Sequence, residues 1–203
     1  TLGELWAIPI MLRLTLVENL RRLAARLVER DRQRLLAARW AERLVETAER
    51  RPGDLVLLVA DLARAVQPLN AAFVAELAQR LQGRGEALAQ ALEWIAARLA
   101  DDNQTVAALA ARDAEAASLD AVSLANCLAS LRLIARCDWH AFVESASLVE
   151  QTLRRDPAGV YPAMDFATRD HYRHLVERLA RQHALSENAL AEQALALAAV
   201  HHG

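Results

Sequence analysis

The sequence has 203 residues, of which 54% are hydrophobic, so it is long enough to bury a substantial core. Its formal net charge is −2, which excludes a protein that attracts nucleic acid through its overall charge. Its 24 basic residues are all arginine. No uninterrupted apolar run approaches the ~18 residues of a membrane span, and no basic leader marks a signal peptide. Because the chain lacks an initiator methionine and stops abruptly at Gly203, we expect a fragment of a larger protein.

The first fifty residues predict a long amphipathic helix. Thr1 and Glu4 have the spacing of a capping box, in which side chains satisfy the free amide groups at a helix N-terminus. Apolar residues then recur at steps of three and four along one face: Leu12, Leu16, Leu20, Leu23 and Leu27. The apolar face lapses from Glu29 to Arg34 and resumes out of phase. The pattern predicts either one long bent helix or two helices joined near Asp31.

Short helices are predicted along the rest of the chain. The clearest break is the segment 51–54, where Asp54 is placed to cap the next helix. Ser118, Asp138 and Ser147 are placed to cap later helices, and Ser147 with Glu150 repeats the capping-box spacing. Helices are expected at residues 54–65, 70–81, 85–100, 103–117, 118–136, 138–145, 147–155, 165–182 and 186–200. Their short connections favour antiparallel neighbours. The predicted fold class is therefore all-α, a bundle of antiparallel helices in one domain over 1–203, with an alternative sub-boundary near 51–54.

The segment from Asp156 to Arg173 departs from this pattern. Two prolines and a glycine interrupt the periodicity, so an irregular loop is expected near residues 156–165. Charged and aromatic side chains gather in and just after it, and these are the candidate site residues: Asp156, Tyr161, Asp165, Arg169, Asp170 and Tyr172. Three interpretations stay open: the charges fix the loop, they contact another domain, or they act on a sugar or a phosphate.

The loop-fixing interpretation is favoured by the spacing of these residues. Asp165 is placed to cap a helix, Arg169 lies one turn later, and Tyr161 can turn its ring into the core. A glycan-active enzyme would instead hold two of the three aspartates about 5 to 9.5 Å apart across a cleft. Carboxylates that fix a loop should each bond an arginine or backbone amides, and Arg169 should then bond a carboxylate or loop carbonyls. We assign no catalytic residue from the sequence.

Metal and thiol chemistry have little support. His171 and His174 lie three residues apart and could offer two nitrogens, but a zinc site needs three or four ligands. If Cys127 and Cys137 share one helix, they are about 15 Å apart and cannot form a disulfide bond. We expect two free thiols, as in a reducing compartment, with no metal and no cofactor in this fragment.

The N-terminal helix is rich in arginine. From Arg13 to Arg51 there are 11 arginines and 6 acidic residues, a local charge of +5. The pairs Glu18 with Arg22 and Glu46 with Arg50 have intrahelical spacing, which favours a solvated, salt-bridged face. Anionic lipid or an acidic neighbouring domain is the alternative partner. No aromatic residues alternate with the arginines to stack bases, so nucleic acid is not expected.

A family resemblance rests on several of these segments. The run Asp156–Tyr161, the run Met164–Asp170 and the following Tyr172–His174 resemble a signature of bacterial cyclic β-1,2-glucan synthases, upstream of their membrane-embedded glucosyltransferase domain. Other matching segments are Thr1–Pro9, Met11–Arg13, Glu18–Arg22, Ser130–Arg132 and Asp138–Trp139. The residues between 55 and 117 contribute little. His171 departs from the family pattern, which usually has an arginine-like residue there, and this weakens a metal role further.

The resemblance implies a parent enzyme of the bacterial inner membrane that polymerises glucose from UDP-glucose and cyclises the product. The fragment itself contains no nucleotide-binding glycine motif, no Ser/His/Asp arrangement and no Asp-x-Asp pair of a nucleotide-sugar transferase. We therefore expect a non-catalytic helical region on the cytoplasmic face, bracing or docking the catalytic domain of the same polypeptide. The alternatives are a glycan-active enzyme using Asp156, Asp165 or Asp170, and a stand-alone helical protein-binding module.

Overall fold

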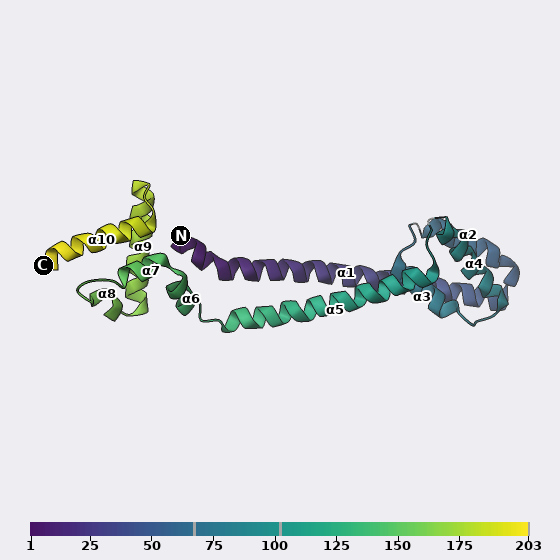
Figure 1. Cartoon of the computed structure of the whole chain (residues 1–203). Coiled ribbons are helices and arrows are strands. Elements are labelled where there is room, and N and C mark those ends of the chain that lie inside the picture. Colours follow the sequence, from purple (N-terminus) through teal and green to yellow (C-terminus); the bar gives the residue numbers. More distant parts are fainter. Residues whose placement is uncertain (67, 102, 203) are drawn as a thin grey trace. The chain divides into compact units, whose positions relative to one another are not determined.

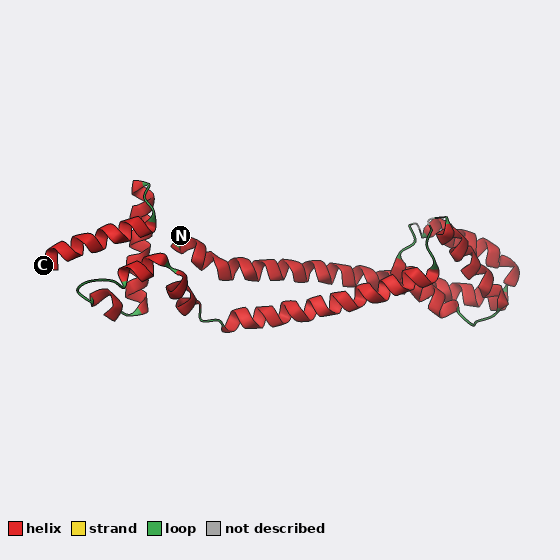
Figure 2. Ribbon diagram, in the orientation of Figure 1, coloured by secondary structure: helices red, strands yellow, loops and turns green. Residues whose placement is uncertain are grey.

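The computed structural model describes residues 1–66, 68–101 and 103–202, and only the backbone of His201 and His202. Within those ranges every regular element is helical, with ten α-helices and one 3-10 turn (Figure 1, Figure 2). This confirms the predicted all-α fold. The connections expected at Gln67 and Asp102 involve residues outside the described ranges.

The chain begins with α1 (Leu2–Arg50), a 3-10 turn (Pro52–Asp54), α2 (Leu55–Ala65), α3 (Ala71–Leu81) and α4 (Glu86–Ala100). It continues with α5 (Val106–Arg136), α6 (Trp139–Ala146), α7 (Leu148–Leu153), α8 (Val160–Ala163), α9 (Phe166–His183) and α10 (Glu187–His202). The helices form two compact units: unit 1 is Thr1–Val17 with Ala129–Gly203, and unit 2 is Glu18–Leu128. The break expected near residues 51–54 lies within unit 2, where it separates α1 from α2.

Helix α1 is continuous through Asp31, where the sequence left open a junction of two helices. Leu23, Ala37 and Leu44 are fully buried on one face, and Arg30 occupies the position midway between the first two. The Arg30 side chain is only 11% exposed, because it pairs with two aspartates of α5. The apolar pattern therefore lapses where a buried, paired arginine takes the place of a leucine, and the helix itself does not end.

Helix α5 corrects the prediction of two helices divided at Ser118. Its inward face carries two acidic residues, Asp113 and Asp120, that are buried against arginines of α1. These charges interrupted the apolar pattern without interrupting the helix. Among the described helices, α5 is also long and apolar enough to span a bilayer by length and composition, with a mean hydropathy of 1.3 over 18 residues. No uninterrupted apolar run revealed this in the sequence.

The core of unit 2 lies where α2, α3 and α4 pack against the second half of α1. Phe73 and Leu77 of α3 are completely buried there. Asn70 caps α3 by accepting a hydrogen bond from the Ala72 amide at 2.9 Å. Asp54, which we expected to cap α2, makes no such side-chain bond, because its backbone already has helical angles of φ −86° and ψ −6°. A capping side chain normally projects from an extended backbone.

The core of unit 1 is smaller. Val149, Tyr161, Val176 and Ala191 are buried together, from α7, α8, α9 and α10. Helices α6 and α7 of this unit are capped as the sequence predicted: Asp138 accepts from the Ala141 amide, and Ser147 accepts from the Glu150 amide. With so few apolar residues in the core, polar contacts have to contribute to the order of this unit.

The first turn of α1 belongs to unit 1 and is held by carboxylates distant in sequence. The Leu2 amide donates to Glu187 at 3.0 Å, and the Gly3 amide donates to Oε1 of Glu177 at 3.2 Å. The hydroxyl of Thr1 accepts from the Glu4 amide, as the capping-box spacing predicted. Amide groups that a helix N-terminus leaves free are therefore satisfied by α9 and α10.

Replacing Gly3 with alanine is expected to give no gain in stability, although alanine in a helix is normally better than glycine by about 1 kcal/mol. A Cβ at this position would lie 3.0 Å from Glu177 Oε1, the atom that accepts the Gly3 amide. The control is Gly53→Ala, because nothing lies within 4 Å of a Cβ there. Thermal melting of both variants checks this, and a melting temperature raised by Gly3→Ala would contradict it.

Candidate functional site: a buried ion-pair cluster in unit 1

The loop that follows α7 is organised by Asp156. Its carboxylate accepts hydrogen bonds from the backbone amides of Ala158, Val160 and Tyr161, at 3.1, 2.9 and 3.0 Å. Gly159 has a left-handed backbone with φ of 67°, a conformation that glycine adopts without strain. The stretch expected to be irregular thus contains a single helical turn, α8, whose entry is fixed by one aspartate.

The other two candidate aspartates are also bound to donors. Asp165 caps α9 as predicted, accepting from the Thr168 amide at 2.9 Å and from its hydroxyl at 2.8 Å. These bonds hold the pKa of the Asp165 carboxyl below its usual range. Asp170 accepts from the guanidinium of Arg173 at 2.9 Å. All three carboxylates have the partners expected of groups that fix a loop.

Beneath the loop lies a group of charged and hydrogen-bonding side chains, which we call the Glu150 cluster: Glu144, Glu150, Tyr161, Arg169 and Arg173. The Glu150 side chain is fully buried and accepts from the Tyr161 hydroxyl at 2.6 Å and from Arg173 at 2.5 Å. The Arg173 side chain is also completely buried. A buried charge of this kind is tolerated only when paired and hydrogen-bonded, so these residues depend on one another.

Arg169 ties the loop to the cluster. Its guanidinium donates to Glu144 through Nε and Nη2, and through Nη1 to the main-chain carbonyl of Met164. Glu144 lies on α6 and Met164 at the end of α8, so one side chain joins two elements to α9. The sequence interpretation expected Arg169 to bond a carboxylate or a loop carbonyl, and it bonds both.

Glu144 and Glu150 were not identified as site residues from the sequence. Glu150 was interpreted as half of a capping box with Ser147. The Ser147 hydroxyl does accept a hydrogen bond from the Glu150 amide, but the Glu150 side chain turns inward and bonds Tyr161. The available signal was the pair Arg169 and Arg173, which lie four residues apart on one face of α9 and require buried acidic partners.

The remaining candidate residues lie at the edge of the cluster. Tyr172 is 43% exposed, and its ring is 6.5 Å from the ring of Tyr161. His174 bonds Glu177 at 3.2 Å, and its other nitrogen lies 3.5 Å from Asp170, whereas the nearest recorded contact of His171 is the ring of Tyr172. Among the residues that the structure describes, no three histidine, cysteine or acidic side chains converge as metal ligands would.

Two buried N–H groups have no acceptor oxygen within the described chain, Trp6 Nε1 and Arg173 Nε, and the side chains of both residues lie near the Phe166 ring. The guanidinium carbon of Arg173 is 5.0 Å from the centre of the Phe166 ring, and the Trp6 ring meets Phe166 edge-on at 6.4 Å. The negative face of an aromatic ring attracts such cationic and N–H groups. The Phe166 ring therefore offsets part of the cost of burying Arg173.

The Glu150 cluster makes the stability of unit 1 sensitive to acid. Burial raises the pKa of the Glu150 carboxyl, but hydrogen bonds from Tyr161 and Arg173 outweigh it, so the pKa lies below its usual value. A lowered folded-state pKa means that the stabilisation is present above the unfolded value, near 4.5, and is lost as the pH falls through the folded value. We expect the melting temperature to fall below about pH 4.5, with a shallower fall for Glu150→Gln. An equally steep fall in Glu150→Gln would contradict this.

Unit 2 contains a second polar feature, the ion pairs between α1 and α5. Arg26 and Arg30 pair with Asp120, and Arg30 and Arg34 pair with Asp113, at distances from 2.7 to 3.2 Å. The pairing of residue 26 with 120 and of residue 34 with 113 makes the two helices antiparallel. The sequence predicted intrahelical pairs, and Glu18 with Arg22 and Glu46 with Arg50 do form. Three arginines of the same helix nevertheless point to a neighbour.

The thiols lie as expected of unbridged cysteines. Cys127 is buried in unit 2, where its sulfur accepts from the side-chain amide Nδ2 of Asn19 at 3.1 Å, and Cys137 is exposed. Both are free, which confirms the prediction that they do not form a disulfide.

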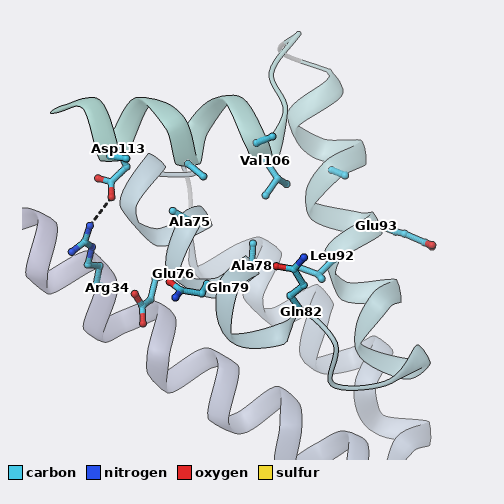
Figure 3. A pocket seen from close by; sticks show the side chains of 14 residues that line it. Arg34, Ala75, Glu76, Ala78, Gln79, Gln82, Leu92, Glu93, Val106 and Asp113 are labelled. Carbon is cyan, nitrogen blue, oxygen red and sulfur yellow. Dashed lines mark hydrogen bonds and ion pairs between the residues drawn. The ribbon is translucent and has the colours of Figure 1, made fainter. Parts of the chain in front are cut away.

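Unit 2 also carries a solvent-open groove of about 840 Å³, which we call the α3–α5 groove (Figure 3). It runs between α3 and α5, with α4 along one side, and the Arg34–Asp113 pair closes one end. Six alanines are among the residues that line it: Ala75, Ala78, Ala96, Ala107, Ala110 and Ala114. Polar residues at its border are Glu76, Gln79, Gln82 and Glu93.

The fold and the Glu150 cluster define a class of protein: an all-α segment whose loop carboxylates are bound to its own donors. No family model matches the sequence, and no solved structure matches the chain. Among curated proteins, the cyclic beta-(1,2)-glucan synthase NdvB of Rhizobium meliloti (strain 1021) is 35% identical over 195 residues. The chain therefore matches a segment of a cyclic β-1,2-glucan synthase, as its signature segments predicted. The match covers 96% of this chain and 7% of the relative's length.

Proposed function

We propose that this chain is a helical, non-catalytic region of a cyclic β-1,2-glucan synthase that braces or docks the catalytic domain. The observation that carries the proposal is the state of the three candidate carboxylates. Asp156, Asp165 and Asp170 each bond amides, hydroxyls or an arginine of the same unit, which leaves them poorly placed to act on a sugar. The 35% identity over 96% of the chain supports the assignment to a synthase.

The parent would be a membrane glucosyltransferase that makes cyclic β-1,2-glucan from UDP-glucose, with this region on the cytoplasmic face of the bacterial inner membrane. The principal partners would be other domains of the same polypeptide, and anionic lipid of the inner leaflet a second partner. The surface of the signature segment suits docking, because Val160 is 55% and Tyr172 43% exposed beside the rigid Glu150 cluster. A rigid element that presents exposed apolar and aromatic groups is a common form of docking surface.

The arginines of α1 are less available for lipid than the sequence suggested. Arg21 and Arg22 are bonded to Glu18, and Arg30 is buried between Asp113 and Asp120. An arginine already paired with a carboxylate gains less from an anionic headgroup than a free one does. We therefore place the main docking surface on the signature segment and not on the arginine-rich helix.

Replacement of Arg169 with alanine tests whether this segment serves the fold or a partner. The variant leaves Glu144 and the Met164 carbonyl without their donors, so the free energy of unfolding should fall by about 1 to 3 kcal/mol. The measurements are thermal melting of the 203-residue chain and glucan output of the full-length synthase. Unchanged melting together with reduced glucan output would identify Arg169 as a contact to another domain instead.

The absence of catalysis is tested directly by incubating the purified chain with labelled UDP-glucose and, separately, with β-1,2-glucan. We expect no transfer and no release of glucose. Turnover that survives purification and is lost in Asp165→Ala or Asp156→Ala would replace the proposal with a glycan-active enzyme.

A further inference from the structure

The α3–α5 groove has the shape of a trench along two helices and not of a compact cavity. Along α3 it is lined by Ala75, Ala78 and, just beyond the end of that helix, Gln82; along α5 it is lined by Ala107, Ala110 and Ala114. Seven residues of a helix extend over about 10 Å, so each wall continues for about two turns. A trench of this length with walls of small side chains admits an elongated occupant that approaches closely.

The groove lies directly over the core of unit 2. Leu92 and Val106 belong to its lining and also pack against the buried cluster, yet both remain only partly buried. The alanines beside them leave unfilled a volume of about 840 Å³. Large aliphatic side chains from outside would extend the apolar packing of Leu92 and Val106 without displacing any part of unit 2.

The charges at the groove favour a basic occupant. Its ionisable lining residues are three acids and one arginine, and that arginine, Arg34, is bonded to Asp113 at 2.7 Å. Glu76 is bonded to Arg80, whereas Glu93 at the border makes no ion pair within the described part of the chain. The border amides Gln79 and Gln82 are neutral. An occupant with arginine or lysine beside its apolar face would therefore be attracted, and an acidic one repelled.

We propose that the α3–α5 groove binds an amphipathic α-helix with aliphatic residues on one face and basic residues along its edges. Aliphatic side chains at steps of three and four would enter the trench and pack against its alanines, as in other helix-in-groove contacts. Basic side chains at the helix edge would meet Glu93, the bordering acid that makes no ion pair within the described part of the chain. This inference does not depend on the proposed bracing function, because it concerns a different face and needs only the 203-residue chain.

The test uses two synthetic helical peptides of about 14 residues, labelled for fluorescence anisotropy. Both carry leucine at steps of three and four, and the other positions are rich in arginine in one peptide and glutamate in the other. The arginine peptide should bind saturably, at least about tenfold more tightly than the glutamate peptide. Equal affinity of the two peptides, or no binding of either, would overturn the proposal.

Variants that fill the groove locate the binding. Ala110→Leu and Ala78→Leu each place a larger side chain in the trench. Each should weaken the affinity for the arginine peptide by about tenfold or more. The matched control is Ala121→Leu, at an exposed position on α5 outside the groove lining. This variant should bind the arginine peptide as tightly as the unsubstituted 203-residue chain does. Glu93→Gln should weaken binding and reduce its salt dependence. Affinity retained in both groove-filling variants, with helical circular dichroism unchanged, would show that the peptide binds elsewhere.

Discussion

Replacing Arg173 with methionine is expected to lower the free energy of unfolding of unit 1 by about 3 to 5 kcal/mol, the effect of leaving a buried charge without its partner. The Arg173 side chain is completely buried and lies 2.5 Å from the fully buried Glu150 carboxylate. Glu150 keeps Arg154 at 2.7 Å and Arg169 at 3.4 Å, which compensate only in part because Arg154 is 45% exposed and Arg169 is more distant. The measurement is thermal or chemical unfolding followed by circular dichroism.

The matched control is Arg178→Met, an exposed arginine on the same helix α9, which should change stability by no more than about 0.5 kcal/mol. The double variant Arg173→Met with Glu150→Gln removes both charges, so it should be less destabilised than the sum of the single variants. If Arg173→Met proved as mild as Arg178→Met, the Glu150 cluster would not be the polar core of unit 1.

Replacing Arg30 with methionine is expected to destabilise unit 2 by about 1 to 3 kcal/mol, because it removes a side chain that bonds both buried aspartates of α5. Asp113 and Asp120 are each less than 10% exposed, and they retain Arg34 and Arg26 as partners, which limits the loss. Urea unfolding of unit 2 measures the effect.

The control for Arg30→Met lies two residues further along α1. Arg32 is 77% exposed, and its ion pair with Glu29 is solvent-exposed at 3.6 Å. Arg32→Met should therefore have almost no effect on stability. Equal unfolding midpoints for the two variants would mean that the contact between α1 and α5 depends on apolar packing alone. Hydrogen exchange of the α5 amides gives an independent measure, since lost pairing should lower their protection.

Much of the helix architecture could be predicted because the signals are local. Capping by Thr1, Asn70, Asp138, Ser147 and Asp165 joins groups two or three residues apart, so spacing alone indicates it. The two errors of this kind also have a local cause. Asp54 lies in a 3-10 turn and cannot act as a cap, and Ser118 lies inside α5, where buried aspartates had interrupted the apolar pattern.

The candidate site was only partly visible. Arg169 and the aspartates of the signature segment were recognised because they lie close together in the sequence. Glu144 is 25 residues from Arg169, and Glu150 is 23 residues from Arg173, so no spacing rule connects them. A glutamate in a short helix is usually solvated, and only the packing of α6, α7 and α9 reveals that these two are not.

The sequence by itself determined the all-α class, most helix boundaries, the special character of the segment from Asp156 to Arg173, and the resemblance to cyclic β-1,2-glucan synthases. These follow from periodicity, capping and short motifs, which depend on neighbours along the chain. Only the tertiary structure decided which charges are buried and which are solvated. Arg34 meets Asp113 across 79 residues, and its neighbour Arg32 stays in solvent, although the two arginines are alike in sequence. The difference arises because burial depends on which helix face meets another element, and a long-range pairing fixes that face.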